Sequence, residues 1–201
     1  MGRHEDFLGQ SFPLSDLRRV ELELEPATAE NIAPFGELLA FGRGRPVTRT
    51  RFYDNAVELM EKPAFMSDAD TCLSLARVHP RPLEVTWLER HFKHTQVFLP
   101  LNALPWCAVL APPTQGDLPD VAQARAFCFA GDCGLLMHVG TWHEFPFALD
   151  APTDMVVVLR NETNRNLDAV SDGEAVGEDL EKRNIAKRFG VRLAIRRSAG
   201  V

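Results

Sequence analysis

Short apolar stretches separated by Pro, Gly and polar residues dominate the chain from about residue 70 onward. They follow one another at intervals of about ten residues and are rich in β-branched and aromatic side chains, a pattern typical of strands. The stretches are TCLSLARVHP, LEVTWLERH, TQVFLPL, WCAVLAPP, ARAFCFAG, GLLMHVG, TWHEFPFAL and DMVVVLRNE. We therefore predict an antiparallel all-β sandwich or barrel, with the prolines at strand ends or edges.

The segment before these stretches predicts one strand, one short helix and one loop. In RRVELELEPAT, the apolar residues Val20, Leu22 and Leu24 alternate with charged residues, as in a half-buried strand. The sequence TAENIAPFGELL predicts a short helix with Thr28 as its N-cap and Gly36 near its end. The arginine-rich stretch GRGRPVTRT, residues 42–50, predicts a loop that is either solvated or in contact with an anion.

The C-terminal tail has a different pattern. Its sequence predicts a helix over residues 178–189 that ends at Gly190, followed by a basic strand. Residues 174–201 contain seven Lys or Arg against four Asp or Glu, which indicates a solvated or subunit-contacting face. We treat residues 1–201 as a single domain with an N-terminal extension over 1–18 and a C-terminal extension over 174–201.

Composition narrows the classes of function. A length of 201 residues with 45% hydrophobic content suits one compact domain. The net charge of −6 and the pI near 5.5 argue against nucleic acid or an anionic membrane as the partner. The charged N-terminus does not resemble a signal peptide and no apolar run could span a bilayer, so we predict a cytoplasmic protein. The four cysteines form no CxxC pair, and we interpret them as reduced core residues.

The densest group of polar side chains in the strand region lies in LERHFKHTQVFLPL, residues 88–101. This segment contains Glu89, Arg90, His91, His94 and Gln96 on one strand, a turn and the start of the next strand. Alternation along a strand places Glu89 and His91 on the same face, and the turn can bring Gln96 back toward them. Buried polar groups without partners are costly, so these groups predict a ligand, a metal or a mutual hydrogen-bond network.

A second group of polar side chains lies in LMHVGTWHEFP, residues 136–146. Gly140 and Thr141 predict a bend at the end of a strand, so that either His138 or His143 could reach the mouth of a barrel. The alternative is that each histidine is hydrogen-bonded in the core and that Glu144 is solvated.

These segments resemble the cupin superfamily and, more closely, the ureidoglycolate lyase family. Glu89-x-His91-x4-Gln96 occupies the place of the first cupin motif, with Glu and Gln at two ligand positions, and Gly140-x2-His143 matches the end of the second. Over roughly residues 22–168, four blocks resemble the lyase family in the same order: LEPATAENIAPFGELL, LERHFKHTQVFLPL, ARAFCFAGDCGLLMHVGTWHEFPFAL and DMVVVLRNE.

The resemblance implies a cupin-like double-stranded β-helix, a jelly-roll barrel with a few peripheral helices. It also implies a homodimer that eliminates urea from (S)-ureidoglycolate to give glyoxylate in allantoin and purine nitrogen breakdown. This elimination needs a base, an acid and a group that holds the substrate carboxylate. We assign the proton-transfer steps to His143, His91, Glu89 and His138, and the binding of the small carboxylate substrate to Arg77, Gln96, Trp142 and Glu144.

A divalent metal could take over part of this chemistry. The candidate ligands for Ni, Mn or Zn are His91, His143, Glu89 and Gln96, and no organic cofactor is expected.

Two departures from the family pattern leave other functions open. Glu144 stands where the family has a second histidine after the Trp-His pair, and Ala76 stands where it has an asparagine before Arg77. The alternatives are a cupin-type enzyme acting on another small hydroxy or keto acid, and a non-catalytic protein that binds a small carboxylate.

Overall fold

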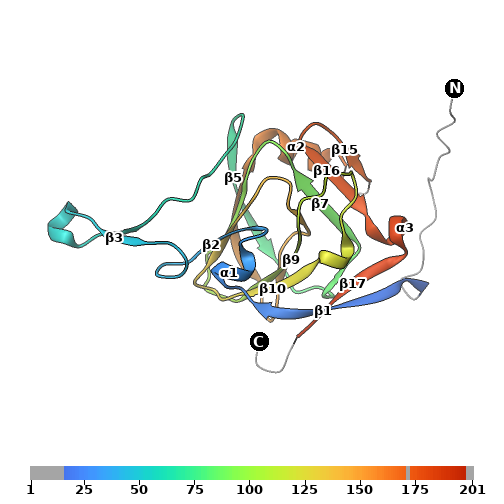
Figure 1. Ribbon diagram of the computed structural model, residues 1–201, viewed down its shortest axis with the longest axis horizontal. Coiled ribbons are helices and arrows are strands. Elements are labelled where there is room, and N and C mark those ends of the chain that lie inside the picture. The colour runs from blue at the N-terminus through green and yellow to red at the C-terminus, as the bar shows by residue number, and fades with distance from the viewer. Residues whose placement is uncertain (1–15, 171–172, 198–201) are drawn as a thin grey trace.

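The computed structural model describes residues 16–170 and 173–197, which form two curled β-sheets with a few short helices (Figure 1). We call the ten-stranded sheet the large sheet; its order is β15-β16-β7-β12-β9-β10-β1-β17-β6, with β13 paired to β9. Its strands are β1 (Arg18–Pro26), β6 (Glu84–Val85), β7 (Trp87–His91), β9 (Trp106–Ala111), β10 (Arg125–Phe129), β12 (Trp142–His143), β13 (Phe147–Ala148), β15 (Ala175–Val176), β16 (Leu180–Asn184) and β17 (Val191–Arg196).

The second sheet, which we call the small sheet, has five strands in the order β2-β11-β8-β14-β5. They are β2 (Gly36–Leu39), β5 (Thr71–Val78), β8 (Gln96–Pro100), β11 (Gly134–Met137) and β14 (Thr153–Arg160). The remaining elements are the hairpin strands β3 (Val47–Arg49) and β4 (Glu58–Met60), the helices α1 (Ala29–Ile32), α2 (Asn161–Ala169) and α3 (Ile185–Phe189), and the 3-10 turns η2 (Phe52–Asn55) and η3 (Val121–Gln123). The prediction of an all-β fold with a few peripheral helices is confirmed.

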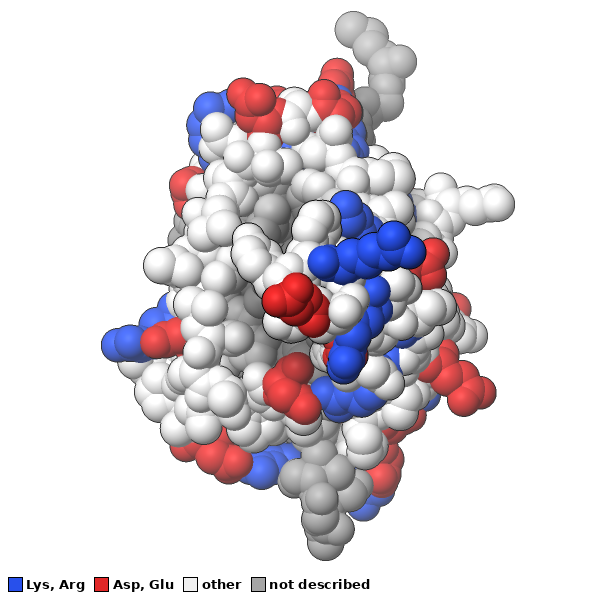
Figure 2. All heavy atoms as spheres, turned by 90° about the vertical axis from the view of Figure 1, so that its left-hand side faces the viewer, with Lys and Arg blue, Asp and Glu red and all other residues white. Residues whose placement is uncertain are grey.

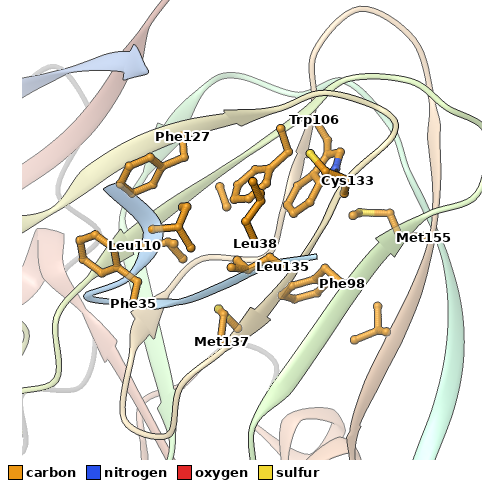
Figure 3. Close-up of a cluster of buried hydrophobic side chains, with 14 of the residues drawn as sticks. Phe35, Leu38, Phe98, Trp106, Leu110, Phe127, Cys133, Leu135, Met137 and Met155 are labelled. Atoms are coloured by element: carbon orange, nitrogen blue, oxygen red, sulfur yellow. Dashed lines mark hydrogen bonds between the residues drawn. The ribbon is translucent and has the colours of Figure 1, made fainter. Parts of the chain in front are cut away.

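The main apolar cluster fills the space between the two sheets (Figure 3). The small sheet contributes Phe98 and Leu135, and the large sheet contributes Trp106 and Phe127. The rings of Trp106 and Phe129 stack with centroids 4.1 Å apart. This packing fixes the inner faces of both sheets, and therefore fixes which residues of each strand face the barrel interior.

A second apolar cluster lies on the opposite face of the large sheet. Strand β9 shows the division, because Trp106, Ala108 and Leu110 belong to the first cluster whereas Cys107 and Val109 belong to the second. A strand buried on both faces needs an unbroken apolar sequence, and every residue of WCAVLA is buried. The four cysteines are free thiols; Cys107 and Cys133 are buried and the other two are half-buried, in agreement with the prediction.

The predicted helix over residues 178–189 is wrong for most of its length. Residues 180–184 form strand β16, which pairs antiparallel with all of β7, and only residues 185–189 are helical. Pairing with an otherwise open strand edge overrides the weak helical preference of this polar segment. The end of the prediction is confirmed, since Gly190 caps α3 in the left-handed conformation and the basic strand β17 follows.

The first strand and helix agree with their prediction except at the helix end. Thr28 caps α1, and its side-chain oxygen accepts a hydrogen bond from the backbone N–H of Asn31 at 3.2 Å. The helix ends at Ile32, so Gly36 does not terminate it; Gly36 instead begins β2, where a Cβ atom would collide with the carbonyl oxygen of Leu136. Gly36 is thus required by the close approach of two strands.

The segment predicted to be a loop over residues 42–50 contains strand β3, which pairs with β4 in a hairpin. The hairpin projects from the barrel (Figure 1). Figure 2 views the molecule from this side, and shows a largely uncharged face with basic and acidic side chains gathered over part of it. Because all three residues of β3 are exposed, no buried apolar face marked this strand in the sequence.

The predicted C-terminal extension belongs to the barrel. Strands β15, β16 and β17 of the C-terminal extension are integral members of the large sheet, whereas residues 1–15 of the N-terminal extension lie outside the described residues. Within residues 16–170 and 173–197, no helix is long and apolar enough to cross a membrane.

Candidate active site

The polar side chains of the two sequence segments meet in the barrel interior. His143 on β12 lies directly opposite Glu89 on β7 and, on its other side, opposite Leu110 on β9. Directly paired residues share a face of a sheet, and Leu110 belongs to the cluster between the sheets. His143 and Glu89 therefore point into the interior, and alternation along β7 places His91 there too. Gln96 enters from the small sheet, on the same face of β8 as Phe98.

The acidic and imidazole groups lie within reach of a shared ligand. Nε2 of His143 is 3.6 Å from Oε1 of Glu89, and Nε2 of His91 is 4.0 Å from the same oxygen. The two imidazole rings are edge to face, with centroids 5.2 Å apart. The backbone ties the two segments together as well, since the N–H of Gly140 donates to the carbonyl of His91 at 2.7 Å.

The local backbone fixes the tautomer of His143. Its Nδ1 lies 3.0 Å from the carbonyl oxygen of Thr141, which can only accept, so Nδ1 carries the proton. The hydroxyl of Thr141 in turn donates to the carbonyl of Phe35 at 2.8 Å, and Gly140 adopts a φ of 82° that favours glycine. The lone pair of His143 is therefore on Nε2, directed toward Glu89.

Burial sets the protonation states of the site. It raises the pKa of Glu89 to about 7, helped by the nearby carboxyl of Glu144 and opposed by Lys182. Burial lowers the pKa of His143 to about 4, against the opposing effect of the Thr141 carbonyl. Burial, together with His143 and His94, also lowers the pKa of His91 well below its ordinary value. At neutral pH the imidazoles of His143 and His91 are neutral, and Glu89 exchanges its proton readily.

A second polar group adjoins the first through His91. The ring of His94 stacks on that of His91 with centroids 4.8 Å apart, and its Nδ1 is 3.5 Å from Oδ2 of Asp179. Asp179 also accepts hydrogen bonds from the backbone N–H groups of Phe92 and Lys93 and from the hydroxyl of Thr163. Although burial opposes it, these contacts hold the pKa of Asp179 well below its usual range, so Asp179 is a fixed anion behind His94.

Several buried polar atoms of the site have no hydrogen-bond partner within the protein. They are both ring nitrogens of His91, both ring nitrogens of His94, Nε2 of His143 and Oε1 of Gln96. Unsatisfied polar atoms at this density are unusual in a folded protein and indicate a polar occupant. Two sets of donors could hold a metal ion, each with its ligand atoms within 4.8 Å of one another: Glu89, His91 and His143, and His91, His94 and Asp179.

Glu144 lies between two basic side chains beside the site. Its Oε1 is 3.6 Å from the guanidinium of Arg81, and Lys182 acts on it from the other strand. Burial raises the pKa of Glu144 to about 7 in spite of both cations. Arg81 is held in place, since it donates to the carbonyls of Phe145 and Pro146 and its guanidinium lies 3.8 Å from the centroid of the Phe147 ring.

Three of the predicted site residues are not brought into this group. His138 is exposed in the turn after β11, with its backbone N–H bonded to the Phe35 carbonyl. Arg77 is exposed on the outer face of β5 and makes two hydrogen bonds, of 2.6 and 2.9 Å, with Asp154 on β14. Trp142 is buried in the apolar cluster behind the large sheet, and its Nε1 donates to the Thr114 hydroxyl at 3.0 Å.

The sequence interpretation missed Asp179 and Lys182, and gave no role to His94. Both missed residues belong to the segment that we predicted to be a helix outside the barrel. In such a helix, neither side chain would lie next to a strand of the site. Once residues 180–184 are known to pair with β7, Lys182 lies opposite Glu89 and Leu180 opposite His91. Only this long-range pairing, which leaves no local pattern, places them at the site.

The sequence matches a known protein family over most of its length. Residues 19–178 match the family model described as ureidoglycolate lyase. A Burkholderia mallei (strain NCTC 10229) protein named ureidoglycolate lyase is 35% identical over 154 residues, which is 73% of this chain and 86% of that protein. Proteins with the same name from Pseudomonas syringae pv. tomato and Azotobacter vinelandii are each 32% identical, over 73% and 76% of this chain and 87% and 93% of their own lengths.

Among solved structures, a dTDP sugar isomerase from Desulfovibrio desulfuricans G20 aligns with a TM-score of 0.39 and 12% identity. The alignment covers 75% of this chain and 85% of the isomerase.

Proposed function

Because this chain belongs to the ureidoglycolate lyase family, we propose that it eliminates urea from (S)-ureidoglycolate and leaves glyoxylate, in allantoin and purine nitrogen breakdown. The observation that carries the proposal is the pair of half-buried Glu89 and buried His143, whose side chains lie 3.6 Å apart and are in complementary protonation states. An elimination of this kind needs a base and an acid on one small substrate, and this pair supplies both.

In the proposed mechanism, His143 is the base and Glu89 the acid. The lone pair on Nε2 of His143 takes the proton of the substrate hydroxyl as the carbonyl of glyoxylate forms. The carbon–nitrogen bond breaks, its electron pair leaves with the urea nitrogen, and that nitrogen takes the proton of Glu89. A carboxyl with a pKa of about 7 can hold this proton at neutral pH and still release it. The proton then returns from His143 to Glu89 across the same short gap.

The polar atoms without partners are suited to the rest of the substrate. Oε1 of Gln96, which has no hydrogen-bond partner within the described residues, can accept an N–H of the ureido group. His91, neutral and adjacent to Glu89, can donate to or accept from the substrate carbonyl or hydroxyl. Arg77 and Trp142 contribute through the scaffold, since neither lies in this interior group.

The proposal is tested by incubating the purified protein with racemic ureidoglycolate and measuring both products. We expect urea and glyoxylate to appear in equal amounts and the reaction to stop when half of the racemate is consumed. Turnover of another small hydroxy acid, without urea release from ureidoglycolate, would support the alternative of a different cupin-type enzyme. Binding of a small carboxylate without any turnover would support a sensor.

The donor set also fits a divalent metal such as Ni, Mn or Zn. Glu89, His91 and His143 could bind it through one carboxylate oxygen and two imidazole nitrogens that are otherwise without hydrogen-bond partners, with Gln96 nearby. A cation there would polarise the hydroxyl and carboxylate of the substrate.

Nε2 of His143 cannot bind a metal and accept the substrate proton at the same time. An experiment that removes the metal therefore distinguishes metal binding from the proposed acid–base chemistry. The acid–base assignment predicts that ureidoglycolate turnover survives dialysis against EDTA and that the purified protein contains well under one metal ion per chain by mass spectrometry. Loss of activity on chelation, restored by one of these metals, would reassign Glu89, His91 and His143 from proton transfer to coordination.

We also propose that the protein works as a cytoplasmic homodimer. The open edge of β5 and the exposed side chains of Leu73 and Leu75 on that strand support a contact between two copies. Light scattering gives the mass in solution, and a monomer at micromolar concentration would contradict the dimer.

A further inference from the structure

His91, His94 and Asp179 form a buried group of donors beside the proposed acid–base pair. His91 ends β7, His94 lies in the turn between β7 and β8, and Asp179 directly precedes β16. The pairing of Leu180 with His91 brings these segments together. All three residues are at most 4% exposed, and one ligand atom of each lies within 4.8 Å of the others. The group therefore has the composition and the spacing of a metal site.

Asp179 is a buried carboxylate without a cationic partner from the protein. Its Oδ1 accepts hydrogen bonds from the backbone N–H groups of Phe92 at 3.3 Å and Lys93 at 2.8 Å, and its Oδ2 accepts one from the hydroxyl of Thr163. Hydrogen bonds of this kind orient the carboxylates that bind metals. Among the residues that the structure describes, no lysine or arginine side chain forms an ion pair with Asp179. Buried charges are usually paired or bound to a metal, so this carboxylate calls for a cation.

The imidazole of His94 does not meet Asp179 as a hydrogen-bond donor. Its Nδ1 is 3.5 Å from Oδ2 of Asp179, and neither of its ring nitrogens has a hydrogen-bond partner. A charge-assisted N–H···O bond is about 2.7–2.9 Å long, whereas two ligands of a tetrahedral ion, each at about 2.0–2.1 Å, lie roughly 3.3 Å apart. The observed separation is closer to that of two ligands on one ion.

His91 can complete the set. Its ring stacks on that of His94 with centroids 4.8 Å apart, and both of its ring nitrogens are also without hydrogen-bond partners. Two imidazoles and one carboxylate suit Zn²⁺ or Ni²⁺, whereas Mg²⁺ and Ca²⁺ prefer oxygen ligands. Asp179 lies just beyond residues 19–178, which match the family model, so the set depends on the C-terminal extension of this chain.

We propose that His91, His94 and Asp179 form a metal site that binds Zn²⁺ or Ni²⁺ reversibly and is distinct from the set of Glu89, His91 and His143. An ion at this site leaves Glu89 and Nε2 of His143 for proton transfer. It also joins the C-terminal extension to the turn after β7. The inference does not depend on the lyase function, because metal binding is measured without turnover.

The test begins with wild-type protein freed of metal by dialysis against EDTA and returned to a buffer without chelator. Isothermal titration calorimetry then measures the binding of zinc chloride. We expect one equivalent of Zn²⁺ to bind and Tm to rise with the zinc concentration, because an ion that binds only the folded state stabilises it. Magnesium chloride should give neither effect.

Variants of the ligands that the two sets do not share assign the ion to one of them. His94→Ala and Asp179→Asn should each weaken zinc binding at least about 100-fold, since loss of an outer hydrogen-bond partner alone costs about 10- to 100-fold. Glu89→Gln, which alters the other set, and His138→Ala, which removes an exposed imidazole, should bind zinc as tightly as wild type. Should His94→Ala unfold, as judged by circular dichroism, Asp179→Asn carries the test, since its amide oxygen can still accept the two backbone hydrogen bonds.

The inference is overturned if metal-free wild type takes up no zinc, or if Asp179→Asn binds it as tightly as wild type. It also fails if Glu89→Gln loses as much affinity as Asp179→Asn, because the ion then belongs to the other set. Equal affinity for Mg²⁺ and Zn²⁺ would rule out a site with two imidazole ligands. If zinc binds as expected but no urea is released from ureidoglycolate, the lyase proposal fails and this site stands.

Discussion

Replacement of His143 by alanine is expected to lower kcat for ureidoglycolate at least about 100-fold, the usual contribution of a positioned base. The imidazole is the group whose protonation state and direction are most firmly determined. Its Nδ1 proton is held by the Thr141 carbonyl, so Nε2 is free to accept a proton beside Glu89. Since the side chain is needed mainly in the transition state, kcat/KM should fall by a similar factor.

The matched control is His138→Ala, which removes another imidazole from the same segment but from an exposed turn. We expect this variant to keep kcat within about twofold of wild type. Steady-state assays of urea release, with circular dichroism to verify folding, give both numbers. Wild-type activity in His143→Ala, or an equal loss in both variants, would remove His143 from the acid–base chemistry.

The sequence predicted the centre of the site because that part depends on local periodicity. Alternation along residues 87–91 placed Glu89 and His91 on one face, and the Gly140 bend correctly separated His143 from the strand before it. The same reasoning failed for Arg77, since alternation alone does not say which face of β5 is interior. The inner face belongs to Ala76, which packs against the main apolar cluster.

The remaining part of the site depends on contacts between residues distant in the sequence. Asp179 and Lys182 reach the interior only because β16 pairs with β7, about 90 residues earlier in the chain. A polar segment such as EDLEKRN has no apolar alternation, so nothing local distinguishes a strand from a helix. Charged residues of β16 are compatible with burial where they have partners: Glu181 binds Arg90 on β7, and Arg183 donates to the backbone carbonyl of Ala175.

Replacement of Glu89 by glutamine is expected to lower kcat about 100-fold and also to change how stability depends on pH. Glutamine keeps the shape of the protonated carboxyl but cannot release a proton, so the acid step is lost while the fold remains. The kcat of the variant should therefore stay about 100-fold below that of wild type at every pH, and the variant should be at least as stable as wild type in the neutral range. Glu61→Gln, at an exposed position after the β3–β4 hairpin, is the control for a general change of charge.

The pH effect follows from the raised pKa of Glu89, about 7 in the folded protein against 4.5 ordinarily. A raised carboxyl pKa means that the folded state binds the proton more tightly than the unfolded chain does. Its contribution to stability is therefore fully present below pH 4.5 and is lost as the pH rises through 7, by at most about 3 kcal/mol. Buried His143 has the opposite dependence, but it is unchanged in the variant and cancels in the comparison.

Urea denaturation in the presence of EDTA, at intervals from pH 5 to pH 8.5, measures this difference. We expect the free energy of unfolding of Glu89→Gln to rise relative to that of wild type over this range and to level off above about pH 8. Glu61→Gln should run parallel to wild type. If the curves of Glu89→Gln and wild type are also parallel, Glu89 is ionised in the folded protein at neutral pH, and it can then act on the substrate only as a base or a ligand.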